Sequence, residues 1–296
     1  MSWCGLLNVD KPAGMTSRQA VDHVLKLVRP SKVGHAGTLD PLATGVLIVC
    51  VGAATRLITR VQQGRKRYVG RFLLGKRSDT EDTDGKVVEG GDWSGVTRSQ
   101  LERLLPEFLG TIQQTPPQIS AVKVAGHRAY KLARRGEAIE LEPRPVEVFS
   151  MRISLFEPPE FELEIECGSG TYVRAIGRDL GERLGCGAVM SALNRTAIGR
   201  FELADAVPLA SLNATSLRDS LMSPLAAVTE LPQRKLDPAE CVRVRQGRPI
   251  PWGFLPDADC HGEVTLIDAA ENMVGIAQVD PSQQQLLPKL ILFALQ

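Results

Sequence analysis

The segment from Gly34 to Gly45 places three glycines, two threonines and a proline around a single acidic residue, Asp40. Pro41 biases Asp40 toward an extended backbone, and the glycines permit tight turns and the close approach of another molecule. The apolar run Val46–Val51 that follows predicts a buried strand, which anchors the loop in a core. An isolated Asp in such a loop is more often a turn former than a reactive group. The rigid setting nevertheless makes Asp40 the first candidate for chemistry.

Hydrophobic periodicity elsewhere predicts a mixture of helices and antiparallel strands. We expect helices at 16–28 with Ser17 as the cap, Ser99–Phe108, His127–Arg135 and Tyr172–Leu184. We expect strands at Gly5–Val9, Val46–Val51, Tyr68–Leu74, Val146–Phe156 and Glu160–Cys167. Because few strand–helix–strand crossovers are present, the pattern predicts an α+β domain built on a largely antiparallel sheet.

Beyond about Pro208 the pattern changes to short elements separated by Gly and Pro. A helical patch at Leu217–Leu221 is followed by expected strands at Val242–Val244, Glu263–Asp268 and Asn272–Val279. Short strands with tight turns predict a small β module. We therefore expect two domains, at residues 1–230 and 231–296.

The distribution of charge is more informative than the formal net charge of +1. A balanced total lowers the expectation of nucleic-acid binding through bulk charge. However, seven basic residues and no acid lie between Arg60 and Arg77, and a second cluster comprises Lys123, His127, Arg128, Lys131, Arg134 and Arg135. Such clusters fit phosphate contacts on one face of the protein and, equally well, an ordinary solvated surface.

Cysteine spacing and hydropathy exclude several classes of protein. The six cysteines are far apart and show no paired metal-type spacing, so we expect neither disulfides nor a metal site. No apolar run approaches the ~20 residues that cross a bilayer. We therefore expect a cytoplasmic protein that does not associate with membranes.

Four segments, in the same order, resemble the motifs of TruB-type tRNA pseudouridine synthases, the family that includes dyskerin. They are Lys11–Ser17 for the amino-terminal motif, His35–Gly45 for the catalytic motif, Lys66–Tyr68 for the tyrosine motif and Gly170–Arg174 for the arginine motif. The match runs from about Leu6 to about Phe201. The resemblance implies a pseudouridine synthase fold, a largely antiparallel mixed sheet flanked by helices, over residues 1–230. It also implies a small RNA-binding, PUA-like β module over residues 231–296.

The resemblance further implies an isomerase that converts uridine-55 in the T arm of tRNA to pseudouridine after the base is flipped out. The N1–C1′ bond breaks and a C5–C1′ bond forms, and since no electron is lost we expect no cofactor. Asp40 would attack the base, attack the sugar or remove a sugar proton, and the sequence leaves these three paths open. We expect the protein to act on tRNA as a monomer without an obligate protein partner.

The family motifs also imply roles for residues around Asp40. Arg174 would keep the Asp40 carboxylate ionised and oriented. Tyr68 would offer a stacking face and a hydroxyl to the base, Tyr172 and Leu193 would line the pocket, and His35 would fill the space that the flipped base leaves. Asp82 would orient arginine or RNA hydroxyls, and Lys11 and Lys123 would contact phosphates.

Two other classes of function remain open on sequence alone. A non-catalytic RNA-binding or RNA-chaperone protein would use the same basic surface and β module, but binding alone requires neither Asp40 nor Arg174. A glycosidase would use Asp40 as one of two carboxylates. Asp10 is the one weak candidate for the second carboxylate.

Overall fold

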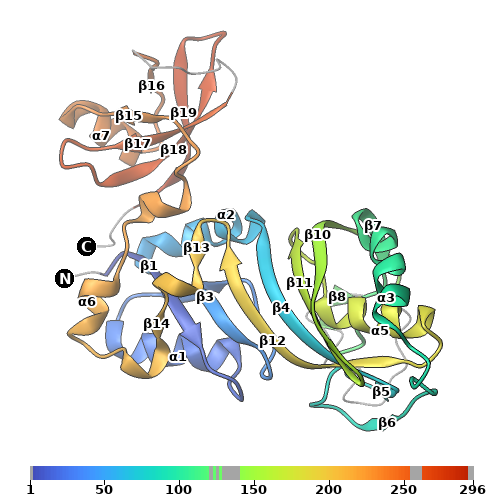
Figure 1. Ribbon diagram of the computed structural model, residues 1–296. Coiled ribbons are helices and arrows are strands. Elements are labelled where there is room, and N and C mark those ends of the chain that lie inside the picture. The colour runs from blue at the N-terminus through green and yellow to red at the C-terminus, as the bar shows by residue number, and fades with distance from the viewer. Residues whose placement is uncertain (1–2, 120–122, 125–126, 129–140, 254–261, 293–296) are drawn as a thin grey trace.

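The computed structural model describes residues 3–119, 123–124, 127–128, 141–253 and 262–292, and the side chains of 123–124 and 127–128 are not among the described groups. Figure 1 shows two bodies, a broad sheet with its helices and a smaller β module. None of the helices in the described ranges has the length and apolar character of a membrane span.

The broad sheet contains ten strands among the described residues, in the order β14-β1-β3-β12-β4-β11-β10-β7, with β13 added to β12 and β2 added to β3. The strands are β1 (Gly5–Lys11), β2 (Val33–Ala36), β3 (Thr44–Val51), β4 (Lys66–Leu74), β7 (Gly110–Gln114), β10 (Arg144–Glu157), β11 (Glu160–Cys167), β12 (Ala188–Ile198), β13 (Phe201–Glu202) and β14 (Val207–Pro208). All pairs are antiparallel except β1 with β14 and β3 with β12. The expected α+β architecture with a largely antiparallel sheet is confirmed.

Among the described residues, the α-helices of the large body are α1 (Ser17–Val28), α2 (Ile58–Gln63), α3 (Arg98–Leu104), α5 (Val173–Arg183) and α6 (Ser216–Ser220). The expected helix at 16–28 is present, but its cap is Thr16 and not Ser17. The Thr16 hydroxyl accepts a hydrogen bond from the Gln19 backbone, and the Gln19 side chain accepts one from the Thr16 backbone. This capping box satisfies two free amides at the helix start, and it leaves the Ser17 hydroxyl for another contact.

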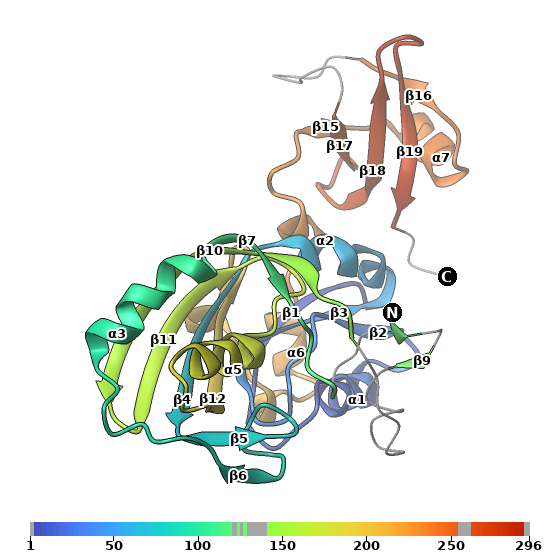
Figure 2. The same ribbon diagram turned by 90° about the vertical axis from the view of Figure 1, so that its right-hand side faces the viewer.

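Close packing against the sheet fixes the position of α5. Figure 2 shows α5 in front of β4 and β12. Phe72 of β4 stacks on Phe161 of β11 at 5.1 Å between ring centroids, and Gly177 of α5 lies over the Phe72 ring, where a Cβ would come within 2.3 Å of it. The absence of a side chain at Gly177 thus lets α5 lie directly on the core, which sets the height of its first turn above the sheet.

The smaller body has a five-stranded sheet in the order β15-β17-β18-β19-β16. Its described elements are β15 (Gln233–Lys235), α7 (Pro238–Arg245), β16 (Ile250–Pro251), β17 (Glu263–Ile267), β18 (Met273–Asp280) and β19 (Gln285–Ile291). Arg60 of α2 forms an ion pair with Glu263 of β17, and Leu57 packs with Met273 and Ile276. The module therefore rests on the α2 side of the large body.

Besides the cap of α1, two sequence-based expectations about secondary structure were wrong. Val242–Val244 lie in α7 and not in a strand, because Asp237 and Glu240 form a capping box with Pro238 in the first turn. His127 and Arg128 form β9 (His127–Arg128), which pairs with β8 (Lys123–Val124), instead of starting a helix. Residues 129–135 of that expected helix lie outside the described residues.

Candidate active site

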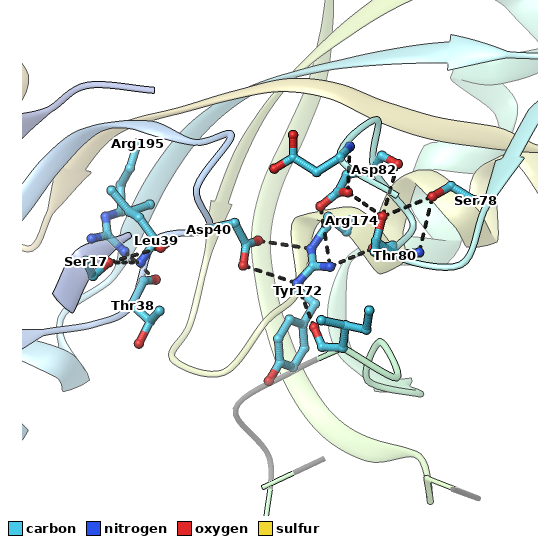
Figure 3. A network of polar contacts seen from close by, with 12 residues as sticks. Ser17, Thr38, Leu39, Asp40, Ser78, Thr80, Asp82, Tyr172, Arg174 and Arg195 are labelled. Atoms are coloured by element: carbon cyan, nitrogen blue, oxygen red, sulfur yellow. Dashed lines mark hydrogen bonds and ion pairs between the residues drawn. The ribbon is translucent and has the colours of Figure 1, made fainter. Parts of the chain in front are cut away.

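The Asp40 loop connects β2 to β3 and presents its carboxylate to Arg174. Arg174 Nε lies 3.0 Å from Asp40 Oδ2, and Arg174 Nη2 lies 3.2 Å from Asp40 Oδ1, so the planar guanidinium meets both carboxylate oxygens (Figure 3). Such a two-point contact fixes the orientation of a carboxylate as well as its charge. The Asp40 side chain remains 32% exposed, which leaves room for a reacting group on its open side.

Arg174 also has partners other than Asp40. It occupies the first turn of α5 and its side chain is buried. Arg174 Nη1 donates to Thr80 O at 2.6 Å and lies 3.5 Å from the buried Asp82 carboxylate, while Nη2 also donates to Ile119 O at 3.2 Å. The guanidinium of Arg174 therefore lies between two carboxylates, those of Asp40 and Asp82 (Figure 3).

Burial and charge act on Asp40 in opposite directions. Burial raises the pKa of Asp40 above its ordinary value, and Arg174 lowers it, while Asp82 and Asp84 raise it again by repulsion. The direction that results is a raised pKa. Arg174 thus favours the ionised form of Asp40 and opposes desolvation, which disfavours a carboxylate.

Two buried cations hold the backbone on either side of Asp40. Arg195 of β12, 1% exposed, donates to Val46 O at 2.7 Å and to Gly37 O at 3.1 Å. Lys11, fully buried, donates to Met15 O at 2.6 Å and Pro12 O at 2.8 Å, and its Nζ lies 3.4 Å from Pro41 O. These contacts fix the loop by its carbonyl groups.

The Ser17 hydroxyl ties the loop to α1. It accepts a hydrogen bond from the Leu39 backbone amide at 2.8 Å and donates to Leu39 O at 3.0 Å. Leu39 directly precedes Asp40, so both backbone groups next to the carboxylate have a fixed partner. The hydroxyl that does not cap α1 therefore positions the loop.

A cavity of about 300 Å³ opens beside Asp40. Tyr68, Tyr172 and Leu193 line it, together with two cations. These are Lys66, which sequence analysis named only within the tyrosine motif and the basic cluster, and Arg195, which it did not single out. Burial raises the pKa of the Tyr68 phenol, although the neighbouring Arg195 opposes that shift, so the hydroxyl keeps its proton. Asp40 is the one carboxylate among the described lining residues, which leaves a glycosidase without its second acid.

Two expected contact residues, His35 and Lys11, do not line the cavity. His35 is in β2 opposite Val49 and is not among the residues that line the cavity, and burial lowers its pKa. Lys11 was expected to contact phosphate, and in this structure its ammonium is buried against carbonyl groups. The Lys123 side chain falls outside the described groups.

The first basic cluster is largely neutralised. Its six surface members contact glutamates, in the pairs Arg60–Glu263, Arg65–Glu166, Arg67–Glu202, Arg71–Glu162, Lys76–Glu89 and Arg77–Glu182. Exposed pairs of this kind contribute little to stability, but they remove the excess positive charge. Most of the cluster is therefore a solvated, salt-bridged surface and not a free phosphate-binding face. In the part of the chain that the structure describes, no group of three or more His, Cys, Asp or Glu side chains has a metal-binding arrangement.

Sequence reasoning missed Arg195, although a signal was available. The segment Ala188–Ile198 is mostly apolar, and in a strand Arg195 and Leu193 share one face. An arginine on the buried face of a strand needs acceptors within reach. That requirement would have pointed to a nearby loop rich in carbonyl groups.

Comparisons of the sequence with known proteins find pseudouridine synthases, and the matches with relatives cover all or nearly all of the chain. A family model described as "TruB family pseudouridylate synthase (N terminal domain)" matches residues 25–173, and one described as "tRNA pseudouridylate synthase B C-terminal domain" matches residues 174–236. A protein of Synechococcus elongatus named tRNA pseudouridine synthase B is 42% identical over 100% of this chain and 100% of its own length. One of the same name from Rhodopseudomonas palustris is 39% identical over 97% of this chain and 80% of its own length.

Among solved structures, a chain of a Cbf5-Nop10-Gar1 complex matches 98% of this chain and 85% of its own, with a TM-score of 0.74 and 24% identity. At that identity the likeness concerns the fold alone. It supports the arrangement of a large mixed sheet with a small terminal β module.

Proposed function

This chain belongs to the TruB family of pseudouridylate synthases and is a pseudouridine synthase, and we propose that it converts uridine-55 in the T arm of tRNA to pseudouridine with Asp40 as the essential carboxylate. The observation that carries the proposal is the two-point contact of Asp40 with Arg174 beside an open cavity. The names of the relatives support tRNA as the substrate.

The cavity has the properties that the isomerisation requires. The N1–C1′ bond breaks, the uracil turns, the C5–C1′ bond forms, and the proton on C5 is lost while N1 regains one. A base cannot turn within a stack, so the uridine must leave the RNA helix, at a cost of a few kcal/mol that contacts in the pocket offset. A volume of about 300 Å³ is at the lower end for small-molecule sites, which suits one nucleoside.

The residues that line the cavity have separate roles in this proposal. Tyr68 offers its ring as a stacking face and a protonated hydroxyl, and Leu193 supplies apolar contact. Tyr172 is fixed by Gln114, which donates to its carbonyl at 3.1 Å and accepts from its amide at 2.8 Å. The exposed side of Asp40 then faces the bond to be broken, whichever of the three paths it follows.

Asp40→Asn in the full-length protein tests the proposal. Each variant is incubated with an unmodified tRNA transcript, and pseudouridine is mapped position by position by carbodiimide treatment and primer extension. We expect the wild type to modify one uridine in the T loop, and Asp40→Asn to bind the transcript without modifying it. A wild type that binds the transcript and modifies no position would favour the RNA-binding alternative.

Asp10→Asn is the matched control, because it makes the same change of charge on β1 away from the cavity lining. We expect it to retain activity. Loss of activity in Asp10→Asn, or loss of both binding and activity in Asp40→Asn, would contradict the roles assigned to these two residues.

A further inference from the structure

Lys66 is a buried cation that faces the cavity. It begins β4 between Cys167 of β11 and Ile198 of β12, is 5% exposed, and lines the cavity. Its ammonium donates to the main-chain carbonyl of Gln62 at the end of α2. An ammonium has three donors, so further donors are directed elsewhere.

Lys66 differs from its basic neighbours in having no carboxylate partner. The six other basic residues of the segment 60–77 each contact a glutamate, whereas no ion pair involves Lys66 within the described ranges. The nearby Cys167 supplies no charge, because burial raises the pKa of its thiol to about 11. Arg195, the other charge near Lys66, is a second cation. Among the described groups, this part of the cavity is therefore positive and has no counter-ion.

Burial lowers the pKa of Lys66 to about 8, so the group is mostly charged at neutral pH. A buried charge without a partner is costly, and a protein retains one where a ligand supplies the opposite charge. The phosphates are the anionic groups of an RNA nucleotide. A neutral uracil carbonyl would accept a hydrogen bond but leave the charge uncompensated.

The position of Lys66 along β4 also favours a contact with the backbone of the nucleotide over a contact with its base. Lys66 and Tyr68 are two residues apart and lie on the same face of the strand, a spacing of roughly 6–7 Å. If Tyr68 stacks on the base, Lys66 lies one step further along, beside the Gly168–Thr171 loop that completes this part of the lining. That loop follows Cys167, the register partner of Lys66, so the two are neighbours.

We propose that the Lys66 ammonium binds a phosphate of the target nucleotide and so holds the flipped uridine against Asp40. This inference rests on the proposed function, since it names the part of the substrate that the cationic side of the cavity receives. A charge-assisted hydrogen bond of this kind contributes about 10- to 100-fold in kcat/KM.

A double-perturbation cycle tests the proposal. T stem-loop RNAs are made with a neutral methylphosphonate at the 5′ or the 3′ phosphate of the target uridine, and kcat/KM is measured for wild type and Lys66→Met. We expect one of the two neutral linkages to lower the wild-type value about 10- to 100-fold, Lys66→Met to lower it equally on normal RNA, and the two changes together to cost no more than either alone. Lys66→Arg should restore most of the loss.

Lys76→Met is the matched control, because Lys76 is a lysine of the same segment that pairs with Glu89 at the surface. It should show no coupling with either linkage. Fully additive losses for Lys66→Met, or coupling to a 2-thio- or 4-thiouridine target instead of a linkage, would overturn the proposal. Equal circular dichroism spectra and a thermal midpoint no lower than that of the wild type separate a lost contact from a lost fold. Failure of wild type on normal RNA would instead refute the proposed function.

Discussion

Substitution of Gly45 by alanine should disturb the site without touching a side chain that contacts substrate. Gly45 has φ +97°, and a Cβ there would lie 2.3 Å from Arg195 O and 2.4 Å from Asn194 Oδ1. The positive φ costs an alanine about 1–2 kcal/mol. Forcing a methyl group against backbone adds about 1–3 kcal/mol. We expect Gly45→Ala to lower the free energy of unfolding by about 2–5 kcal/mol.

The same change should slow catalysis, because Gly45 and Arg195 are register partners where β3 meets β12. If the strands separate, the Arg195 guanidinium moves away from Gly37 O and Val46 O, and the Asp40 carboxylate moves with the loop. A displacement of about 1 Å costs on the order of 100-fold in rate. We therefore expect a single-turnover rate at least about 10-fold lower, with tRNA affinity nearly unchanged.

Gly110→Ala is the control, since Gly110 also has a positive φ, +78°, but a Cβ there would meet no atom of the described chain within 4 Å beyond its immediate neighbours. It should lose about 1–2 kcal/mol in urea unfolding and keep its rate. The reasoning would be refuted if Gly45→Ala were no less stable than Gly110→Ala, or if it reacted at the wild-type rate.

Three further predictions follow from the charges around the cavity. Arg174→Lys should lose at least about 100-fold in kcat, because lysine cannot meet both Asp40 oxygens and Thr80 O with one planar group; wild-type turnover would remove Arg174 from the mechanism. Lys66→Met should raise the free energy of unfolding by up to about 3 kcal/mol at pH 7, because the pKa of Lys66 is lowered in the folded protein from 10.5 to about 8. That penalty is complete below pH 8 and disappears as pH rises toward 10.5, so the advantage of Lys66→Met in denaturant melts should shrink over this interval, and a constant difference would be evidence against it. The pH–rate profile of the wild type should fall on the acid side through the raised pKa of Asp40, at a pH above the ordinary value of 3.8; an acid limb at or below 3.8 would show that Arg174 outweighs burial.

The parts of the site that could be predicted from the sequence are those that depend on residues close together in the chain. Glycines and Pro41 marked the Asp40 loop, the apolar run marked β3, and the periodicity up to Gly185 marked α5 with Arg174 in its first turn. The resemblance to a family then paired Asp40 with Arg174 and gave Asp82 the orientation of arginine or RNA hydroxyls. The structure places all three together.

The parts that sequence could not predict depend on distant partners. Arg195 reaches the loop because β12 lies beside β3, a parallel pair between segments about 150 residues apart. The basic segment 60–77 resembled a phosphate-binding surface because it contains no acid of its own. The glutamates that pair with it come mostly from β11, β13 and α5, which are distant in the sequence. The Val242–Val244 error was local, since the Asp237 and Pro238 start signal was present and overlooked.

The contacts that fix the Asp40 loop are made to its main chain. Arg195, Lys11 and Ser17 all act on backbone groups, at Gly37, Val46, Pro41 and Leu39. The shape of the loop is consequently determined largely by residues outside it, in strands and a helix. These residues can stay the same while a loop residue such as Thr38 or Leu42 is substituted. Transplanting the segment Gly34–Gly45 alone onto another scaffold would carry over the carboxylate without its geometry. Exchanging non-glycine residues of the segment whose side chains make none of these contacts would leave that geometry intact.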